Sequence, residues 1–88
     1  MLEQYFSGLR LVPSKSAYRE LFEYGLRMGE CKKILENGYE PRKRGKDVIE
    51  KWQNVGNKTY NIVIVRSYSR TFNEDVYVIK HVGRFSRK

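Results

Sequence analysis

The fold is decided by the stretch Thr59-Tyr60-Asn61-Ile62-Val63-Ile64-Val65-Arg66-Ser67-Tyr68, followed after a polar segment by Val76-Tyr77-Val78-Ile79-Lys80-His81-Val82. Both runs are dense in β-branched and aromatic residues, which favour the pleated, half-buried surface of a sheet. The segment from Ser69 to Asp75 contains the polar residues that end strands. The two runs therefore predict an antiparallel pair closed by a long hairpin loop.

The first of these runs is expected to be a central strand. Successive side chains of a strand point to opposite faces, so Ile62 and Ile64 share one face and Val63 lies on the other. Because both faces are apolar, we expect this strand to be interior and covered on one side by helices. A further strand is predicted over Asp47 to Gln53, since Asn54 to Lys58 has the composition of a turn.

The first thirteen residues predict little regular structure. Met1 to Phe6 is expected to form a short helical turn or to fray, and Gly8 interrupts it. Leu9 to Val12 is expected to form a brief strand that Pro13 ends.

A first helix is predicted directly after this strand. Ser14 or Ser16 offers the N-cap, since a serine oxygen accepts a hydrogen bond from an otherwise unpaired N–H. Gly25 can take the left-handed conformation that ends a helix. The apolar residues at helical spacing predict a buried stripe of Tyr18, Leu21 and Phe22.

A second short helix is predicted from Met28 or Gly29 to Glu36, and Asn37-Gly38 is a stop signal. Its inner face is expected to hold Cys31, Ile34 and Leu35. The two helices would form an αα-hairpin whose apolar stripe lies against the sheet. On that stripe Cys31 is a small buried hydrophobe rather than a nucleophile.

Length and composition indicate one small α+β domain. The chain has 88 residues, with one cysteine and one histidine. These counts exclude an internal disulfide and disfavour a conventional zinc site, and no cofactor is expected. The N-terminus lacks the pattern of a signal peptide, and no apolar run approaches the ~20 residues of a membrane span. We therefore expect a cytoplasmic protein with no membrane partner.

The charge balance predicts a polyanionic partner. Lys and Arg total 18 against 10 Asp and Glu, a net charge of +8. Such an excess favours RNA or another nucleic acid, or an acidic protein. The alternative is the highly charged surface typical of thermophilic proteins.

The strongest basic stretch is Pro41 to Lys46, which is either a flexible connector or a phosphate clamp. If the next strand pairs with Thr59 to Val65, this loop lies beside the end of the long strand. Arginine grips phosphate through its planar fork, and tyrosine offers a stacking face for an unpaired base. The predicted nucleic-acid-binding residues are Arg42, Lys43, Arg44, Lys46, Arg66, Tyr68, Arg70 and Arg84, with Lys80 and Arg87 as further cations.

No catalytic motif is present: the sequence has no P-loop, no defensible Ser-His-Asp set and no acidic cluster for two metals. Metal-free RNA cleavage would need only charge stabilisation and a proton carrier. The candidate catalytic residues are Tyr68, His81 and Arg66. The alternative for His81 is an ordinary strand histidine at the surface.

Four short motifs carry a resemblance to a known family: Pro13-Ser14-Lys15-Ser16-Ala17, Tyr24-Gly25-Leu26, Leu35-Glu36-Asn37-Gly38-Tyr39, and Val76-Tyr77-Val78-Ile79-Lys80-His81-Val82-Gly83. With these four motifs in this order, the chain resembles the family called domain of unknown function 4258. Members of that family are distantly related to the RelE, ParE and BrnT toxins. The resemblance implies a compact α+β fold and a toxin-like ribonuclease held by an acidic antitoxin-like protein. The family often has a histidine where this chain has Ser16, which implies a binding protein without activity as the alternative.

The expected architecture is α+β, with two short N-terminal helices packed on a twisted antiparallel sheet of three to four strands, similar to the RelE and BrnT toxins. An exposed edge on so small a sheet invites pairing, so a homodimer or a strand-donating partner is expected.

Overall fold

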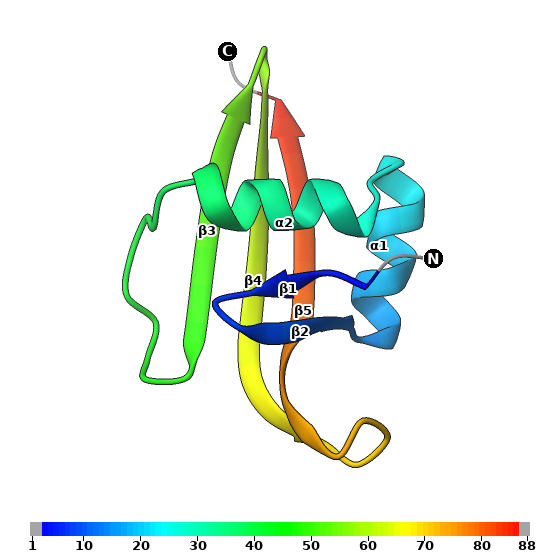
Figure 1. Ribbon diagram of the computed structural model, residues 1–88. Coiled ribbons are helices and arrows are strands. Elements are labelled where there is room, and N and C mark those ends of the chain that lie inside the picture. The colour runs from blue at the N-terminus through cyan, green and yellow to red at the C-terminus, as the bar shows by residue number, and fades with distance from the viewer. Residues whose placement is uncertain (1–2, 87–88) are drawn as a thin grey trace.

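The computed structural model describes residues 3–86, which form two helices and a curled, mixed five-stranded sheet (Figure 1). In chain order the elements are β1 (Tyr5–Phe6), β2 (Leu9–Pro13), α1 (Lys15–Tyr24), α2 (Met28–Asn37), β3 (Val48–Val55), β4 (Lys58–Ser69) and β5 (Glu74–Ser86). The strands lie side by side in the order β1-β2-β5-β4-β3. The α+β class is therefore confirmed.

The predicted hairpin is present and longer than expected. β4 and β5 pair antiparallel from Lys58 with Ser86 to Ser69 with Glu74, so only residues 70–73 form the turn. β3 pairs antiparallel with β4 on its other side, which makes β4 interior as expected. Val63 of β4 pairs with His81, but the next residue, Ile64, pairs with Ile79. Lys80 is therefore an extra residue on β5 and forms a β-bulge.

The N-terminal strands correct the prediction of a three- to four-stranded antiparallel sheet. β2 pairs parallel with β5, and β1 extends the sheet antiparallel to β2. Tyr5 and Phe6 are therefore strand residues rather than part of a helical turn or a frayed end, while Met1 and Leu2 lie outside the described residues. The reason is the tight turn at Ser7 and Gly8, whose φ angles of 53° and 85° suit a two-residue hairpin.

α1 begins and ends where its caps predict. The Ser14 oxygen accepts a hydrogen bond from Ala17 N at 3.1 Å, and Gly25 closes the helix at a φ of 67°. Of the predicted buried stripe, Leu21 is confirmed, whereas Tyr18 and Phe22 are wrong because they are 65% and 84% exposed. The helix instead buries Ala17 and Leu21, since it lies along the free edge of β5 rather than beneath a second helix.

α2 confirms its predicted inner face, with Cys31, Ile34 and Leu35 buried in the core. It crosses the front of the sheet, whereas α1 runs in a different direction beside β5 (Figure 1). Each helix packs mainly on strands, so the expected αα-hairpin does not form a common stripe.

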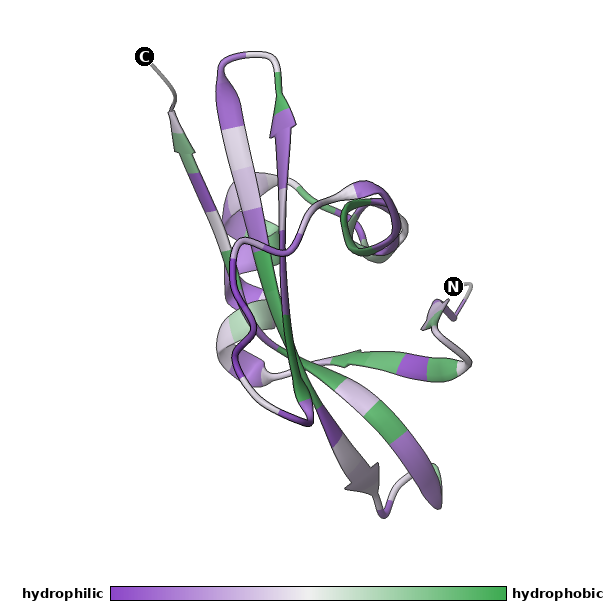
Figure 2. Cartoon of the chain, turned by 90° about the vertical axis from the view of Figure 1, so that its left-hand side faces the viewer, coloured by the Kyte–Doolittle hydropathy of each residue, from purple (hydrophilic) through white to green (hydrophobic). Residues whose placement is uncertain are grey.

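The core occupies the space between α2 and the sheet. Ile62, Ile64, Ile79 and Val82 point to this side and are fully buried. Val63 and its alternate neighbours point to the opposite side, which we call the open face: the face of β3, β4 and β5 remote from α2. Figure 2 shows α2 on one side of the sheet and the connection from α2 to β3 crossing to the other.

Candidate functional site

The open face is built by one ladder of residues in register across four segments. Tyr39 extends the sheet beyond β3 through two backbone hydrogen bonds with Trp52, at 2.8 and 2.9 Å. Trp52 pairs with Asn61 on β4, and Asn61 pairs with Gly83 on β5. Directly paired residues share a face of a sheet, so all four lie on the open face.

Three aromatic rings gather along this ladder. The ring centroids of Trp52 and Phe85 are 5.4 Å apart in an edge-to-face arrangement, and those of Tyr39 and Trp52 are 6.4 Å apart. Tyr39 is 49% and Phe85 44% exposed. We call Tyr39, Trp52 and Phe85 the aromatic cluster.

Gly83 makes room for the amide that lies beside this cluster. A Cβ at Gly83 would collide with the Asn61 side chain and would lie 3.1 Å from His81 Nε2. Asn61 Oδ1 is buried and has no hydrogen-bond partner among the described residues. The absence of a side chain at Gly83 thus lets the Asn61 amide pack directly over the backbone of β5, with its oxygen shielded from solvent.

A buried carboxylate fixes the basic loop to the open face. Glu50 is 4% exposed, and its Oε2 accepts a hydrogen bond from Trp52 Nε1 at 2.7 Å. Its other oxygen lies 3.6 Å from Arg42 Nε and 3.5 Å from Arg44 Nη1. Both arginine side chains stay largely exposed, and the Glu50 carboxylate competes with any other anion for them.

His81 lies on the same face, in register with Val63 and Glu50. Its Nδ1 is 3.1 Å from Glu20 Oε2, and the other oxygen of Glu20 accepts a hydrogen bond from Val82 N at 2.9 Å. Glu20 thus places a side-chain acceptor on the edge of β5 that no strand covers, and orients the imidazole at the same time.

The remaining predicted residues lie at the far end of β4. Arg66 N donates to Asp47 O at 2.9 Å, so the base of the basic loop does lie beside Arg66 as the expected register requires. Arg66 Nη2 is 3.0 Å from Asp75 Oδ2, and this hydrogen bond raises the pKa of Arg66. Tyr68 donates to the Asn73 side chain.

The structure divides the predicted nucleic-acid-binding residues between two faces of the sheet. Arg66 is three residues beyond Val63 on β4, and an odd separation places the two on opposite faces. Arg42 and Arg44 therefore turn to the open face, while Arg66 and Tyr68 point to the other. His81 lies on the open face, so it is also separated from Arg66 and Tyr68, the other two candidate catalytic residues.

The other predicted cations are scattered. Lys43 and Lys46 are exposed in the basic loop, and Arg70 is exposed in the β4–β5 turn. Arg84 pairs with Tyr60 at the opposite end of β4 and lies 5.1 Å from the centroid of the Tyr24 ring. Arg70 and Arg84 therefore lie away from the basic loop that carries Arg42 and Arg44.

From residue 51 to the end of the sequence, the only Asp and Glu residues are Glu74 and Asp75, which pair with Arg10 and Arg66. Residues 51–73 and 76–88 contain eight Lys and Arg and no Asp or Glu. Around the basic loop, by contrast, Asp47, Glu50 and Asp75 offset much of the local charge.

Sequence reasoning missed the aromatic cluster and Glu50. The alternation of Glu50 and Trp52 along the predicted strand places both on one face, which is a usable signal. The contact with Phe85 depends on the register of β5, and that of Tyr39 on an isolated bridge in a loop. Neither pairing has a local sequence pattern.

Comparison with protein-family models, with curated proteins and with solved structures gave no match. Over residues 3–86, neither helix is long and apolar enough to cross a membrane. The same residues contain no group of three or more His, Cys, Asp or Glu side chains that could hold a metal ion.

Proposed function

We propose that this protein binds single-stranded nucleic acid, RNA in the first place, through the open face of its sheet. The observation that carries the proposal is the aromatic cluster lying beside Arg42 and Arg44, with His81 one register position further along. Aromatic rings on an exposed sheet stack on unpaired bases, and arginine guanidinium groups grip the phosphates between them.

A single strand fits this surface better than a duplex. Its bases can be splayed onto rings, whereas the bases of a duplex are already stacked and paired. The net charge of +8 adds attraction for any phosphate backbone and raises the association rate. The base-stacking rings then give the preference for an unpaired strand.

The test is a fluorescence-anisotropy titration of a labelled single-stranded RNA at several salt concentrations. Phe85→Ala should weaken binding by roughly 5- to 150-fold, because a stacked base contributes about 1–3 kcal/mol. The matched control is Tyr5→Ala, since Tyr5 is 41% exposed on β1 and outside the open face. Equal RNA affinity of Phe85→Ala and the wild type at every salt concentration would contradict the proposal.

A second candidate is metal-free RNA cleavage of the kind implied by the toxin resemblance. The observation that favours it is the contact of His81 Nδ1 with Glu20, because a carboxylate that orients an imidazole leaves Nε2 for proton transfer. The test is incubation of free and ribosome-bound mRNA with wild type and His81→Asn in the presence of a chelator. Cleavage by wild type alone supports this activity, while intact RNA and no growth arrest on expression remove it.

A further inference from the structure

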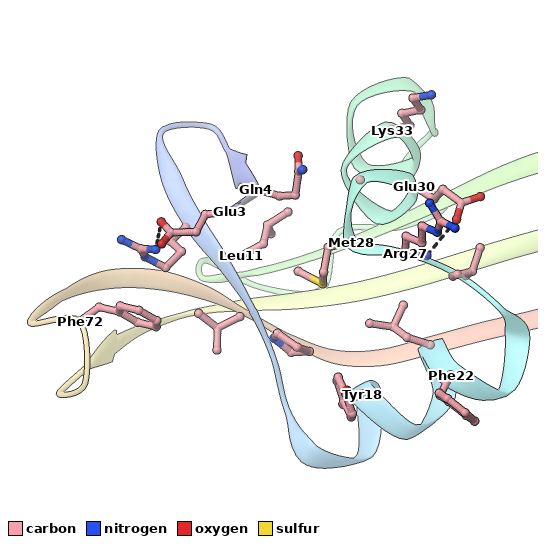
Figure 3. A pocket seen from close by; sticks show the side chains of 16 residues that line it. Glu3, Gln4, Leu11, Tyr18, Phe22, Arg27, Met28, Glu30, Lys33 and Phe72 are labelled. Atoms are coloured by element: carbon pink, nitrogen blue, oxygen red, sulfur yellow. Dashed lines mark hydrogen bonds and ion pairs between the residues drawn. The ribbon is translucent and has the colours of Figure 1, made fainter. Parts of the chain in front are cut away.

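A second surface, on the side of the molecule that carries the helices, has different chemistry. A groove of about 800 Å³ lies between the β1–β2 hairpin, α1 and the first turn of α2 (Figure 3). Its apolar lining includes Val12, Pro13, Tyr18, Phe22, Met28 and Phe72. We call it the helix-side groove.

The groove exposes large aromatic side chains, of which Phe72 also stacks under Arg10, with Cζ 4.1 Å from the ring centroid. Phe22 is 84%, Tyr18 65% and Phe72 41% exposed. Tyr18 and Phe22 are four residues apart on α1, so they present one outward stripe while Ala17 and Leu21 serve the core. Contiguous apolar surface with a polar rim is typical of protein-interaction sites.

The rim of the groove is electropositive. Arg27 is the N-cap residue of α2 and Lys33 lies in its second turn, and both line the groove. Among the described residues, no ion pair involves either of them.

Two carboxylates, Glu3 and Glu30, also line the groove, so three cations (Arg10, Arg27 and Lys33) against two carboxylates leave one excess positive charge. Glu30 accepts a hydrogen bond from Arg27 N at 2.9 Å, and Glu3 pairs with Arg10. Arg10 in turn also pairs with Glu74 at 2.9 Å, so it adds little unpaired charge to the rim.

We propose that the helix-side groove binds an acidic segment of a partner protein that carries large apolar side chains. The apolar residues of the bound segment would cover Tyr18, Phe22 and Met28, and the carboxylates of that segment would face Arg27 and Lys33. Two features argue against a second copy of this chain: the net charge of +8 repels another copy, and both rims would bring cations together. The proposal is independent of nucleic-acid binding, because it uses the other side of the molecule.

The probe is a fluorescein-labelled peptide of about fifteen residues, with leucines at the spacing i, i+3, i+4, i+7 and glutamates elsewhere. One comparison peptide has lysines in place of the glutamates, and another has serines in place of the leucines. Only the acidic leucine peptide should bind with measurable affinity. Binding of all three, or none, would overturn the proposal.

Variants then locate the binding site. Phe22→Ala should lower the affinity for the acidic peptide at least about tenfold, as expected for an aromatic side chain that anchors a partner. Lys33→Glu should lower the affinity for the acidic peptide and raise the affinity for the lysine peptide. Val55→Ala, 52% exposed on β3 and outside the groove, is the control and should bind like wild type. Equal affinity for Phe22→Ala and Val55→Ala would overturn the assignment.

Sedimentation of the unliganded protein tests the competing occupant. A monomer at all concentrations supports the proposal, whereas a dimer that Phe22→Ala dissociates would identify the groove as a self-interface and overturn it. Because Phe22 is mostly exposed, its replacement leaves the core intact, and the urea midpoint of the variant verifies this. Failure of the peptide test leaves the Phe85→Ala result on RNA unaffected, so the two proposals fail separately.

Discussion

Replacing Glu50 by glutamine should make the protein less stable and, at the same time, a better RNA binder. The Glu50 carboxylate is buried between Trp52 Nε1 at 2.7 Å and the guanidinium groups of Arg42 and Arg44 at 3.6 and 3.5 Å. Glutamine keeps the shape and one acceptor oxygen for Trp52. It removes the negative charge that offsets the two arginines.

The loss of stability should be small enough to leave the protein folded. A hydrogen bond to a charged group contributes about 1.5–3 kcal/mol and a neutral one about 0.5–1.5 kcal/mol, so the change at Trp52 costs about 1 kcal/mol. The largely exposed arginine contacts add at most about 1 kcal/mol each. We expect a total loss of about 1–3 kcal/mol from a folding free energy of roughly 4–13 kcal/mol.

The gain in RNA affinity follows from the freed cations. Each phosphate contact on a single strand steepens the dependence of log K on log salt by about 0.7. If Glu50→Gln releases one or both arginines to phosphate, the slope should steepen by about 0.7–1.4, and binding at low salt should tighten. Urea unfolding followed by the fluorescence of Trp52, the only tryptophan, gives the stability change. Anisotropy at several salt concentrations gives the slope.

The control is Glu36→Gln, which makes the same charge change at an exposed position of α2. Any general effect of one less carboxylate appears in both variants and is subtracted. An unchanged slope in folded Glu50→Gln, or equal tightening in both variants, would refute the placement of Arg42 and Arg44 at the phosphates.

Three further predictions concern the open face and the core. Gly83→Ala should lower the unfolding free energy by about 1–3 kcal/mol in urea titration, because the new Cβ displaces the Asn61 side chain; an unchanged midpoint would contradict this close packing. Glu20→Ala should cost about 1–3 kcal/mol in the same assay, since Val82 N loses its acceptor, and a cost below about 0.5 kcal/mol would show that water replaces the carboxylate. Burial raises the pKa of the Cys31 thiol from 9.0 to about 12, so the neutral thiol is favoured in the folded state: this contribution is fully present below pH 9 and is lost as the pH rises toward 12. Unfolding midpoints measured across this range should fall less steeply for Cys31→Ala than for wild type, and parallel curves would contradict the burial of the thiol.

The elements that could be predicted from the sequence are those with local chemistry. Examples are the β-branched runs of β4 and β5 and the helix caps at Ser14 and Gly25. Each of these signals depends only on residues a few positions away in the sequence. The i, i+3, i+4 spacing of Cys31, Ile34 and Leu35 likewise identifies the inner face of α2.

The parts that could not be predicted depend on distant pairing. β2 pairs parallel with β5, 66 positions further along the chain where Arg10 meets Val76, and no local pattern encodes this contact. On α1, Ala17–Leu21 and Tyr18–Phe22 are equally good stripes at i, i+4. Only the position of α1 along the β5 edge decides which of them is buried.

The candidate site shows the same division. Arg42 and Arg44 stand out in the sequence as part of the most basic stretch. Their partner Glu50 and the rings of Trp52 and Phe85 become neighbours only through the cross-strand register. The separation of Arg66 from Arg42 onto different faces also follows from that register and from the direction in which the basic loop turns.

The most direct test of nucleic-acid binding by the open face is a two-dimensional NMR titration of the protein with single-stranded RNA. Saturable shifts are expected for the indole N–H of Trp52 and for the backbone amides of Asn61, Gly83 and Phe85. The amides of exposed residues on α2, such as Glu36, should stay unchanged. Shifts spread evenly over every lysine- and arginine-bearing surface, with the Trp52 indole unaffected, would contradict the account and leave only diffuse attraction by net charge.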